Sequence, residues 1–268
     1  MIVKFFFYIF VGLGVLFLYI KYIEKKSIFF PDKNIDLTPE RFGLSFEDLY
    51  FLTSDKVRLN AWFIPHPEAA KTIILFHGNA GNNSNRLEKI ALLRKLKINI
   101  FMVDYRGYGN SQGIPKEKGI YLDAQAAYGY LVNQRKINPE DIVLYGESLG
   151  GVVAVDLAST KKVAGIILEG TFSSGRDIGQ IIYPFLPKTI LPNIFNSLSK
   201  ISKVKAEKLF IHSKDDLIVP LELGRKLYQA ASGPKKFITV SGTHNSVFID
   251  SEKEYLRALS DFIRGLDE

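Results

Sequence analysis

Residues 146–150 read Gly146-Glu147-Ser148-Leu149-Gly150, a G-x-S-x-G pattern. An apolar run that is typical of a buried parallel strand precedes it, and a run that opens a helix follows it. A serine at such a strand-to-helix turn is exposed above the sheet, and the flanking glycines allow the neighbouring backbone to pass close by. The amide of Leu149 then lies at a helix N-terminus, where it can donate to a developing negative charge. The pattern therefore predicts a nucleophilic serine, Ser148.

A base and an acid follow in the chain. A hydroxyl is a poor nucleophile at neutral pH and needs an imidazole base, whose tautomer is fixed by a carboxylate. After Ser148, one apolar strand breaks into a loop that contains Asp215 and Asp216, and the next breaks into a loop that contains His244. Because the carboxyl ends of parallel strands meet at one sheet edge, we expect the three groups to lie together. The spacing leaves Asp215 and Asp216 equally open as the acid.

Other residues of the same types have simpler interpretations. Glu169 ends a predicted strand at the same sheet edge and is the alternative acid. His66 lies between two prolines in a loop, and His77 ends a strand. His212 lies on a buried strand just before the loop with Asp215 and Asp216 and is interpreted as a hydrogen-bonded core histidine. His244 is the histidine that follows the acid, so it is the predicted base.

Five motifs in this order make the chain resemble the α/β-hydrolase superfamily. Within it, the chain is similar to the membrane-tethered branch of Bem46 and of the ABHD13- and ABHD17-type serine hydrolases. The matching stretches fall between roughly residues 45 and 265, which is essentially the whole chain after its first 45 residues. They are 75–81 (LFHGNAG), 104–113 (DYRGYGNSQG), 146–150 (GESLG), 216–220 (DLIVP) and 242–245 (GTHN).

The resemblance implies site residues that spacing alone does not choose. In this family the acid is the aspartate four residues before the proline of D-x-x-V-P, which is Asp216 here. The amide of Asn79 becomes the second donor to the oxyanion, beside that of Leu149, and His77 shapes the loop that carries it. The expected triad is Ser148, Asp216 and His244, and the chemistry requires no metal or cofactor.

The first 23 residues predict a membrane anchor. Residues 5–20 carry no charge, and Lys4 and Lys21 stand near the ends of an apolar stretch of more than twenty residues. At about 1.5 Å per residue this stretch just crosses a hydrocarbon core about 30 Å thick. A cleaved signal peptide is disfavoured because no small-x-small site follows. The positive-inside rule favours a cytoplasmic catalytic domain by a single charge.

Composition limits the remaining interpretations. The net charge of +7 and the pI of about 9.3 come without any RNA- or DNA-binding motif. Attraction to anionic lipid and a merely solvated basic surface explain that charge equally well, and no nucleic-acid partner is expected. The chain has no cysteine, which argues against a disulfide framework and fits either compartment.

The periodicity predicts an α/β fold. Strands alternate with helices of ten to twenty residues, which indicates a mostly parallel sheet of about eight strands flanked by helices. The first two strands are expected to form an antiparallel hairpin at one edge, and the longest helices are expected over about 84–96, 117–135 and 246–265. Residues 24–45 are charged and proline-bearing and are expected to form a linker before a single hydrolase domain over 46–268. The apolar, proline-rich section 171–205 is interpreted as a short cap-like insertion or, equally, as a surface helix on the sheet.

Together these features predict a membrane-anchored serine hydrolase. An ester or thioester of an apolar acid, in a lipid or an acylated protein, is the expected substrate, and the acyl group would pass through Ser148 to water. A serine peptidase or amidase of the same fold is one alternative. A membrane-tethered scaffold that has lost catalysis is the other, although a binding role requires no complete set of serine, acid and histidine.

Overall fold

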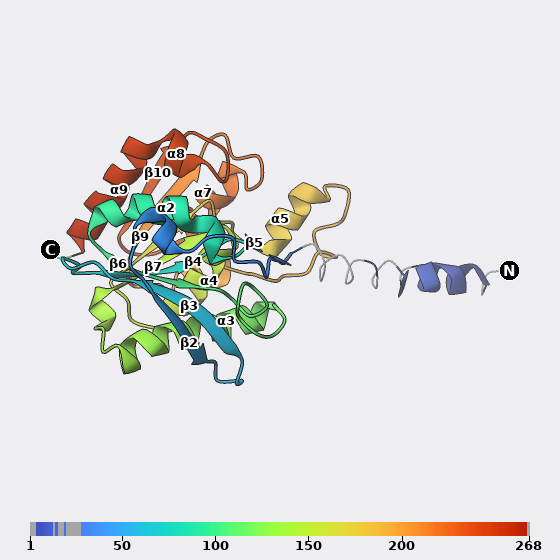
Figure 1. Ribbon diagram of the computed structural model, residues 1–268. Coiled ribbons are helices and arrows are strands. Elements are labelled where there is room, and N and C mark those ends of the chain that lie inside the picture. The colour runs from blue at the N-terminus through green and yellow to red at the C-terminus, as the bar shows by residue number, and fades with distance from the viewer. Residues whose placement is uncertain (1–3, 13, 16–18, 20–27, 267–268) are drawn as a thin grey trace.

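The computed structural model describes residues 4–12, 14, 15, 19 and 28–266, and its centre is an eight-stranded sheet (Figure 1). The strands are β2 Glu47–Leu52, β3 Arg58–Ile64, β4 Thr72–Phe76, β6 Asn99–Val103, β7 Ile142–Glu147, β8 Gly165–Glu169, β9 Glu207–Ser213 and β10 Lys235–Val240. They lie in the order β10-β9-β8-β7-β4-β6-β3-β2, and only the pairs β2–β3 and β3–β6 are antiparallel. The predicted, mostly parallel sheet is confirmed, as is the antiparallel hairpin at one edge.

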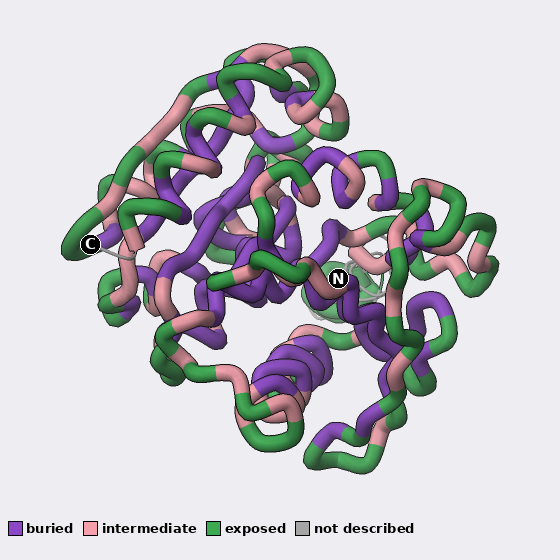
Figure 2. Tube along the Cα trace, turned by 60° about the vertical axis from the view of Figure 1, so that its left-hand side comes forward, coloured by how far each residue is buried: buried purple, intermediate pink, exposed green. Residues whose placement is uncertain are grey.

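Helices cover both faces of this sheet (Figure 1). They are α2 Leu87–Leu93, α3 Glu117–Gly129, α4 Leu149–Ala158, α5 Gly175–Ile182, α6 Leu198–Ile201, α7 Leu221–Ala230, α8 Val247–Asp250 and α9 Glu252–Gly265. Successive strand residues point to opposite faces, so Leu144 belongs to the apolar cluster that includes α3, α4 and α7, whereas Tyr145 belongs to the one that includes α2 and α9. The central strands are buried on both sides, as Figure 2 shows along the middle of the trace.

Three predicted helices are divided. The helix expected over 84–96 is α2 with a 3₁₀ turn at each end, and that over 117–135 ends at Gly129 and continues as a π-helical turn. The helix expected over 246–265 is interrupted at Ser251. The hydroxyl of Ser251 accepts from the amide of Ser241 at 3.0 Å and donates to its carbonyl at 3.0 Å. This bridge to the loop after β10 separates α8 from α9.

Residues 28–45, the described part of the expected linker, pack on the hydrolase domain. Phe30–Pro31 forms the short strand β1, which is paired in parallel with β5, Ala80–Gly81. Ile35, Phe42 and Leu44 lie against the apolar cluster on the α2 side of the sheet. Strands of two residues have no periodicity that a sequence pattern can reveal, so neither strand was predicted.

The section expected as a cap or surface helix contains α5 and α6, joined by a loop with Pro184, Pro187 and Pro192. The start of α5 follows a simple rule, because the hydroxyl of Ser174 accepts from the amide of Asp177 at 3.1 Å and so caps the helix. Figure 1 shows α5 projecting from the domain close to the short strand β5.

At the N-terminus, residues 4–12 are helical and their side chains are exposed. Within the described part of the chain, no helix has the length and apolar character needed to cross a membrane. The predicted anchor over 1–23 includes residues 1–3, 13, 16–18 and 20–23, which lie outside the described residues.

Candidate active site

Strand register brings the candidate residues to one edge of the sheet. Phe76 of β4 is opposite Gly146 of β7, and Glu147 of β7 is opposite Glu169 of β8. In turn Glu169 is opposite Ile211 of β9. The loops that follow β4, β7, β8, β9 and β10 therefore leave the sheet side by side at their carboxyl ends, as the sequence predicted.

Ser148 stands between β7 and α4 in a backbone conformation that L-residues rarely adopt, with φ 51° and ψ −113°. Its amide donates to the carbonyl of Glu169 at 2.8 Å. The glycines on either side are required by contact, because a Cβ on Gly146 would lie 2.4 Å from the carbonyl oxygen of Gly150, and one on Gly150 would lie 1.9 Å from that of Phe76. This is the sharp turn expected of the pattern, and strain of this kind is often stored at functional sites.

Asp216 and His244 form a close pair. Oδ2 of Asp216 lies 2.6 Å from Nδ1 of His244. Oδ1 accepts from the amides of Ile218 and Val219 at 2.9 and 2.8 Å, so both oxygens of the carboxylate are engaged. Burial alone would raise the pKa of Asp216, but the hydrogen bonds from His244 and the two amides lower it. An ionised Asp216 favours the tautomer of His244 with the proton on Nδ1, which leaves Nε2 able to accept a proton.

The two other candidate acids are bonded to groups other than His244. Asp215 points to the surface, where its Oδ2 accepts from the amide of Gly242 at 3.2 Å. Oε1 of Glu169 lies 2.8 Å from Nζ of Lys89, and its Oε2 accepts from the hydroxyl of Tyr255 at 2.7 Å. Geometry therefore joins His244 to Asp216, the residue that the resemblance implied and that spacing did not select.

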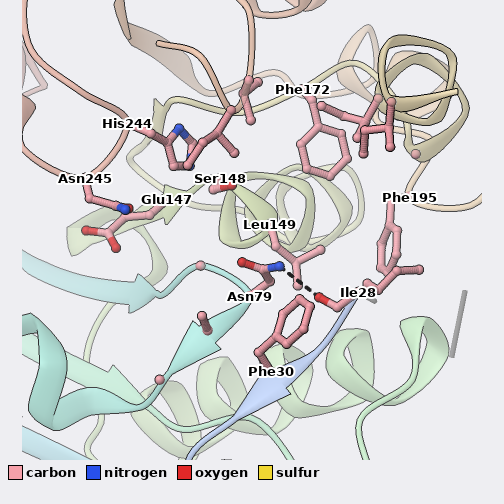
Figure 3. A pocket seen from close by; sticks show the side chains of 18 of the residues that line it. Ile28, Phe30, Asn79, Glu147, Ser148, Leu149, Phe172, Phe195, His244 and Asn245 are labelled. Atoms are coloured by element: carbon pink, nitrogen blue, oxygen red, sulfur yellow. Dashed lines mark hydrogen bonds between the residues drawn. The ribbon is translucent and has the colours of Figure 1, made fainter. Parts of the chain in front are cut away.

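The imidazole and the serine share one pocket. The amide of Ser148 donates to the carbonyl of Glu169, and the next residue, Gly170, lies next to the ring of His244, since a Cβ there would be 3.2 Å from Cε1. Figure 3 shows His244 next to Ser148 at the same opening, with Leu149 and Asn79 on the other side of the serine. Four of the five predicted site residues, Asn79, Ser148, Leu149 and His244, therefore line this pocket, and the fifth, Asp216, is hydrogen-bonded to His244.

The candidate oxyanion donors come from two loops. Leu149 begins α4, where the first amides of a helix have no partner within the helix. Asn79 follows β4, and its neighbour Gly78 is close to Ser148, since a Cβ on Gly78 would lie 3.7 Å from that of Ser148. Nδ1 of His77 lies 2.7 Å from the carbonyl oxygen of Gly78. His77 therefore contacts the peptide group that carries the Asn79 amide, in line with its expected role.

A buried charged cluster that the sequence did not reveal lies on the α2 side of the turn that carries Ser148. Nζ of Lys89 lies 2.5 Å from Oε1 of Glu147 and 2.8 Å from Oε1 of Glu169, and Arg86 lies 3.2 Å from the other oxygen of Glu147. The hydroxyl of Tyr145 also donates to Glu169. Lys89 belongs to an ordinary helical pattern, so only its place in the fold shows that it joins these two carboxylates.

The pocket has a volume of about 1250 Å³. One part is polar and is lined by His244, Asn245, Arg86 and Glu147; Figure 3 shows Asn245 and Glu147 on the His244 side. The other part is apolar and draws mostly on the 171–205 section. Its lining includes Phe172, Ile178, Ile182, Leu186, Leu191, Ile194 and Phe195, together with Ile28 and Phe30.

The remaining histidines have structural partners. Nδ1 of His66 accepts from the amide of Glu68 at 3.0 Å in a loop. Nε2 of the buried His212 lies 2.8 Å from the carbonyl oxygen of Val219, as expected of a hydrogen-bonded core histidine. Among the residues that the structure describes, no group of three or more His, Asp and Glu side chains has a geometry that could hold a metal ion.

Fold and site together define a hydrolase of the α/β class. The model of the α/β-hydrolase fold family matches residues 71–198. The WAV2 protein of Arabidopsis thaliana, named as an α/β-hydrolase domain-containing protein, is 34% identical over 268 residues, with 90% of this chain and 87% of that protein covered. The chain belongs to the α/β-hydrolase superfamily.

Two further relatives are similar to this chain in sequence, and two solved structures are similar to it in fold. Bem46 of Schizosaccharomyces pombe is 31% identical, covering 96% of this chain and 90% of that protein. YNL320W of Saccharomyces cerevisiae, named as a membrane protein, is 34% identical, covering 84% and 82%. The Pyrococcus furiosus esterase Pf2001 superposes with a TM-score of 0.73 at 21% identity, covering 89% of this chain and 98% of that one. Acetyl xylan esterase 1 of Thermoanaerobacterium does so with a TM-score of 0.64 at 16% identity, covering 82% and 84%.

Proposed function

We propose that this protein is a serine hydrolase that cleaves a carboxylic ester or thioester of an apolar acyl group. The observation that carries the proposal is the arrangement around Ser148. A serine in a strained turn at the start of α4 shares a pocket with His244, whose Nδ1 lies 2.6 Å from the ionised Asp216. The fold similarity to two esterases is consistent with this chemistry.

In the proposed reaction, Ser148 attacks the carbonyl carbon while Nε2 of His244 accepts the hydroxyl proton. The negative charge that develops on the carbonyl oxygen is stabilised by the amides of Asn79 and Leu149. His244 then returns the proton to the alcohol or thiol that leaves, and a water molecule releases the acid from the acyl-enzyme by the same steps. Asp216 keeps the proton of the imidazole on Nδ1 throughout.

The two parts of the pocket support an apolar acyl group and a polar leaving group. The side chains of Phe172, Leu191 and Phe195 offer an acyl chain a surface that excludes water. On the other side of Ser148, Asn245 and Arg86 offer hydrogen-bonding groups. An amphiphilic ester or thioester matches this division better than a peptide, whose two sides are both polar in the backbone.

The test is covalent labelling with a fluorophosphonate, using the full chain and its Ser148→Ala variant. Labelling of the wild-type protein alone is the expected result, because the reagent requires an activated serine. We also expect Ser148→Ala to lower kcat by roughly 10⁴–10⁶-fold on p-nitrophenyl esters while the fold persists. A folded wild-type protein that is not labelled would favour the scaffold interpretation. Labelling together with hydrolysis of unactivated peptide amides would favour the peptidase.

The proposal includes an uncleaved membrane anchor at residues 1–23, and a difference of a single positive charge between its two ends favours the cytoplasmic side for the catalytic domain. Its support is the uncharged sequence over 5–20 and the relative that is named as a membrane protein. Retention of the full chain in the membrane pellet after extraction with alkaline carbonate is the expected result. Release into the supernatant would contradict the anchor and leave the proposed chemistry unaffected.

A further inference from the structure

Residues 28–34, which we call the strap, lie directly across the loop that follows β4. The amide of Phe30 donates to the carbonyl of Asn79 at 2.9 Å. In the opposite direction, Nδ2 of Asn79 donates to the carbonyl of Ile28 at 3.0 Å, the bond drawn in Figure 3. The amide of Asp32 donates to the carbonyl of Gly81 at 3.2 Å. The strap thus bonds to both the main chain and the side chain of a candidate oxyanion residue.

The strap is itself held at several points. The carbonyl of Asp32 accepts from the amide of Gly109 at 2.8 Å and from Nδ2 of Asn82 at 3.2 Å. Nζ of Lys33 donates to the carbonyl of Ser111 at 2.6 Å. The ring of Phe29 meets that of Phe195 edge to face, with centroids 6.0 Å apart. These contacts tie the strap to the glycine-rich loop after β6 and to the 171–205 section.

The direction of the Asn79 amide depends on the peptide groups on either side of it. The peptide before Asn79 is fixed through the carbonyl of Gly78, which lies 2.7 Å from His77. The peptide after it is fixed through the carbonyl of Asn79, which accepts from Phe30 and also from the hydroxyl of Tyr108 at 2.7 Å. Burial raises the pKa of Tyr108, so this hydroxyl keeps its proton as a donor. Because peptide groups are planar, bonds to these two carbonyls orient the amide between them.

We propose that the strap positions the oxyanion donor of the proposed hydrolase, with the backbone of Phe30 and Ile28 as its positioning groups. The inference rests on the proposed function of the site. An oxyanion donor is effective only within about 2.7–3.1 Å of the developing charge, so a small rotation of the Asn79 amide reduces transition-state stabilisation and changes ground-state binding little. The segment between the apolar N-terminus and the domain is then part of the active site.

The experiment compares Phe30→Pro with Phe30→Ala in the full chain. Both variants lose the aromatic ring, but only the proline lacks the amide that donates to Asn79. After normalisation by active-site titration, we expect kcat of Phe30→Pro to be about 10-fold or more below that of Phe30→Ala, with KM equal within about twofold. The Ki of a trifluoromethyl ketone, whose adduct carries the oxyanion, should rise by the same factor as kcat falls. A purely structural role would not produce that parallel.

A second measurement does not depend on activity. The amides of residues 82–85 include several that are hydrogen-bonded, such as that of Asn83 to Oδ1 of Asp104 at 2.9 Å and that of Ser84 to Oδ1 of Asn82 at 2.9 Å. Their hydrogen exchange should be faster in Phe30→Pro than in Phe30→Ala. If Phe30→Pro does not fold, Asn79→Ala takes its place, because it keeps the Asn79 amide and loses only the bond to Ile28.

The outcomes separate the two proposals. Equal kcat, Ki and exchange in Phe30→Pro and Phe30→Ala would overturn the role of the strap while the hydrolase remained established. A wild-type protein without hydrolase activity would overturn the proposed function. In that case the exchange rates alone decide whether the strap holds the loop, and unchanged exchange would contradict the inference.

Discussion

Oδ2 of Asp216 lies 2.6 Å from Nδ1 of His244, at the meeting point of two loops that are 28 residues apart in the chain. The same oxygen is 3.7 Å from Nε2 of a second histidine, His212. That nitrogen is occupied by the carbonyl of Val219 at 2.8 Å, and burial lowers the pKa of His212, which keeps its ring neutral. The short bond belongs to His244, and His212 holds the end of the acid loop.

The two adjacent aspartates provide a matched pair of variants. We expect Asp216→Asn to lower kcat by about 10⁴-fold, because an amide cannot hold the proton of His244 on Nδ1. Asp215→Asn should change kcat by less than about threefold, since the carboxylate that it replaces is exposed and outside the pocket. Steady-state kinetics on one p-nitrophenyl ester compares them directly. Equal losses in the two variants would contradict the assignment of the acid.

We expect different effects from substituting the two histidines. His244→Ala should remove most of kcat, because its ring is the proposed base. His212→Ala should reduce stability by about 1–3 kcal/mol, because the buried carbonyl of Val219 loses its partner. Its kcat should fall far less than that of His244→Ala. Denaturant melts and kinetics on both variants test this, and a stable, inactive His212→Ala would reverse the roles.

Sequence order predicted the arrangement of Ser148 and His244 because the carboxyl ends of parallel strands meet at one edge whatever the details of packing. It could not separate Asp215 from Asp216, since both follow the same strand and only the direction of each side chain differs. The family resemblance supplied that choice. The resemblance also supplied Asn79, whose place depends on a loop with no periodic pattern.

Other features arise only through tertiary contact. Lys89 follows the pattern of an amphipathic helix, in which a lysine is normally exposed, yet the fold buries it between Glu147 and Glu169. The strand Phe30–Pro31 exists because the loop after β4 offers it a partner, and its own two residues carry no signal. Polar contacts between segments far apart in the chain leave no local trace in the sequence.

Two glycine substitutions, one of them a control, test how tightly the turn that carries Ser148 packs. Gly150→Ala places a methyl group 1.9 Å from the carbonyl oxygen of Phe76, a backbone atom that cannot yield without moving β4. We expect a loss of stability of about 3 kcal/mol or more and no measurable activity. Gly129→Ala, at the end of α3, meets only the side chain of Asn133 at 3.7 Å and should be neutral or stabilising by up to about 1 kcal/mol. An active, stable Gly150→Ala would show that β4 and α4 do not approach as described.

Removing the cation tests how much the buried cluster around Lys89 contributes to stability. Lys89→Met leaves Glu147 and Glu169 buried without the cation between them, which should cost about 3–5 kcal/mol of unfolding free energy. The control is Lys95→Met, which removes an exposed ion pair with Glu252 and should cost about 1 kcal/mol or less. Chemical denaturation at pH 7 measures both values. Similar values for the two variants would mean that the buried cluster adds no more than a surface pair.

The stability that Lys89→Met loses should depend on pH, and the pKa shifts of Glu147 and Lys89 determine the direction. Burial would raise the pKa of Glu147, but Lys89 and Arg86 outweigh it and lower the pKa, so its contribution to stability disappears as pH falls below about 4.3. Burial would lower the pKa of Lys89, but Glu147 and Glu169 raise it, so its contribution is present below about pH 10.4 and is lost above its raised value. The difference between wild type and Lys89→Met should therefore be largest between about pH 5 and 10 and should shrink on both sides. A difference that stays constant from about pH 3.5 to 11 would mean that the three groups do not act as charges.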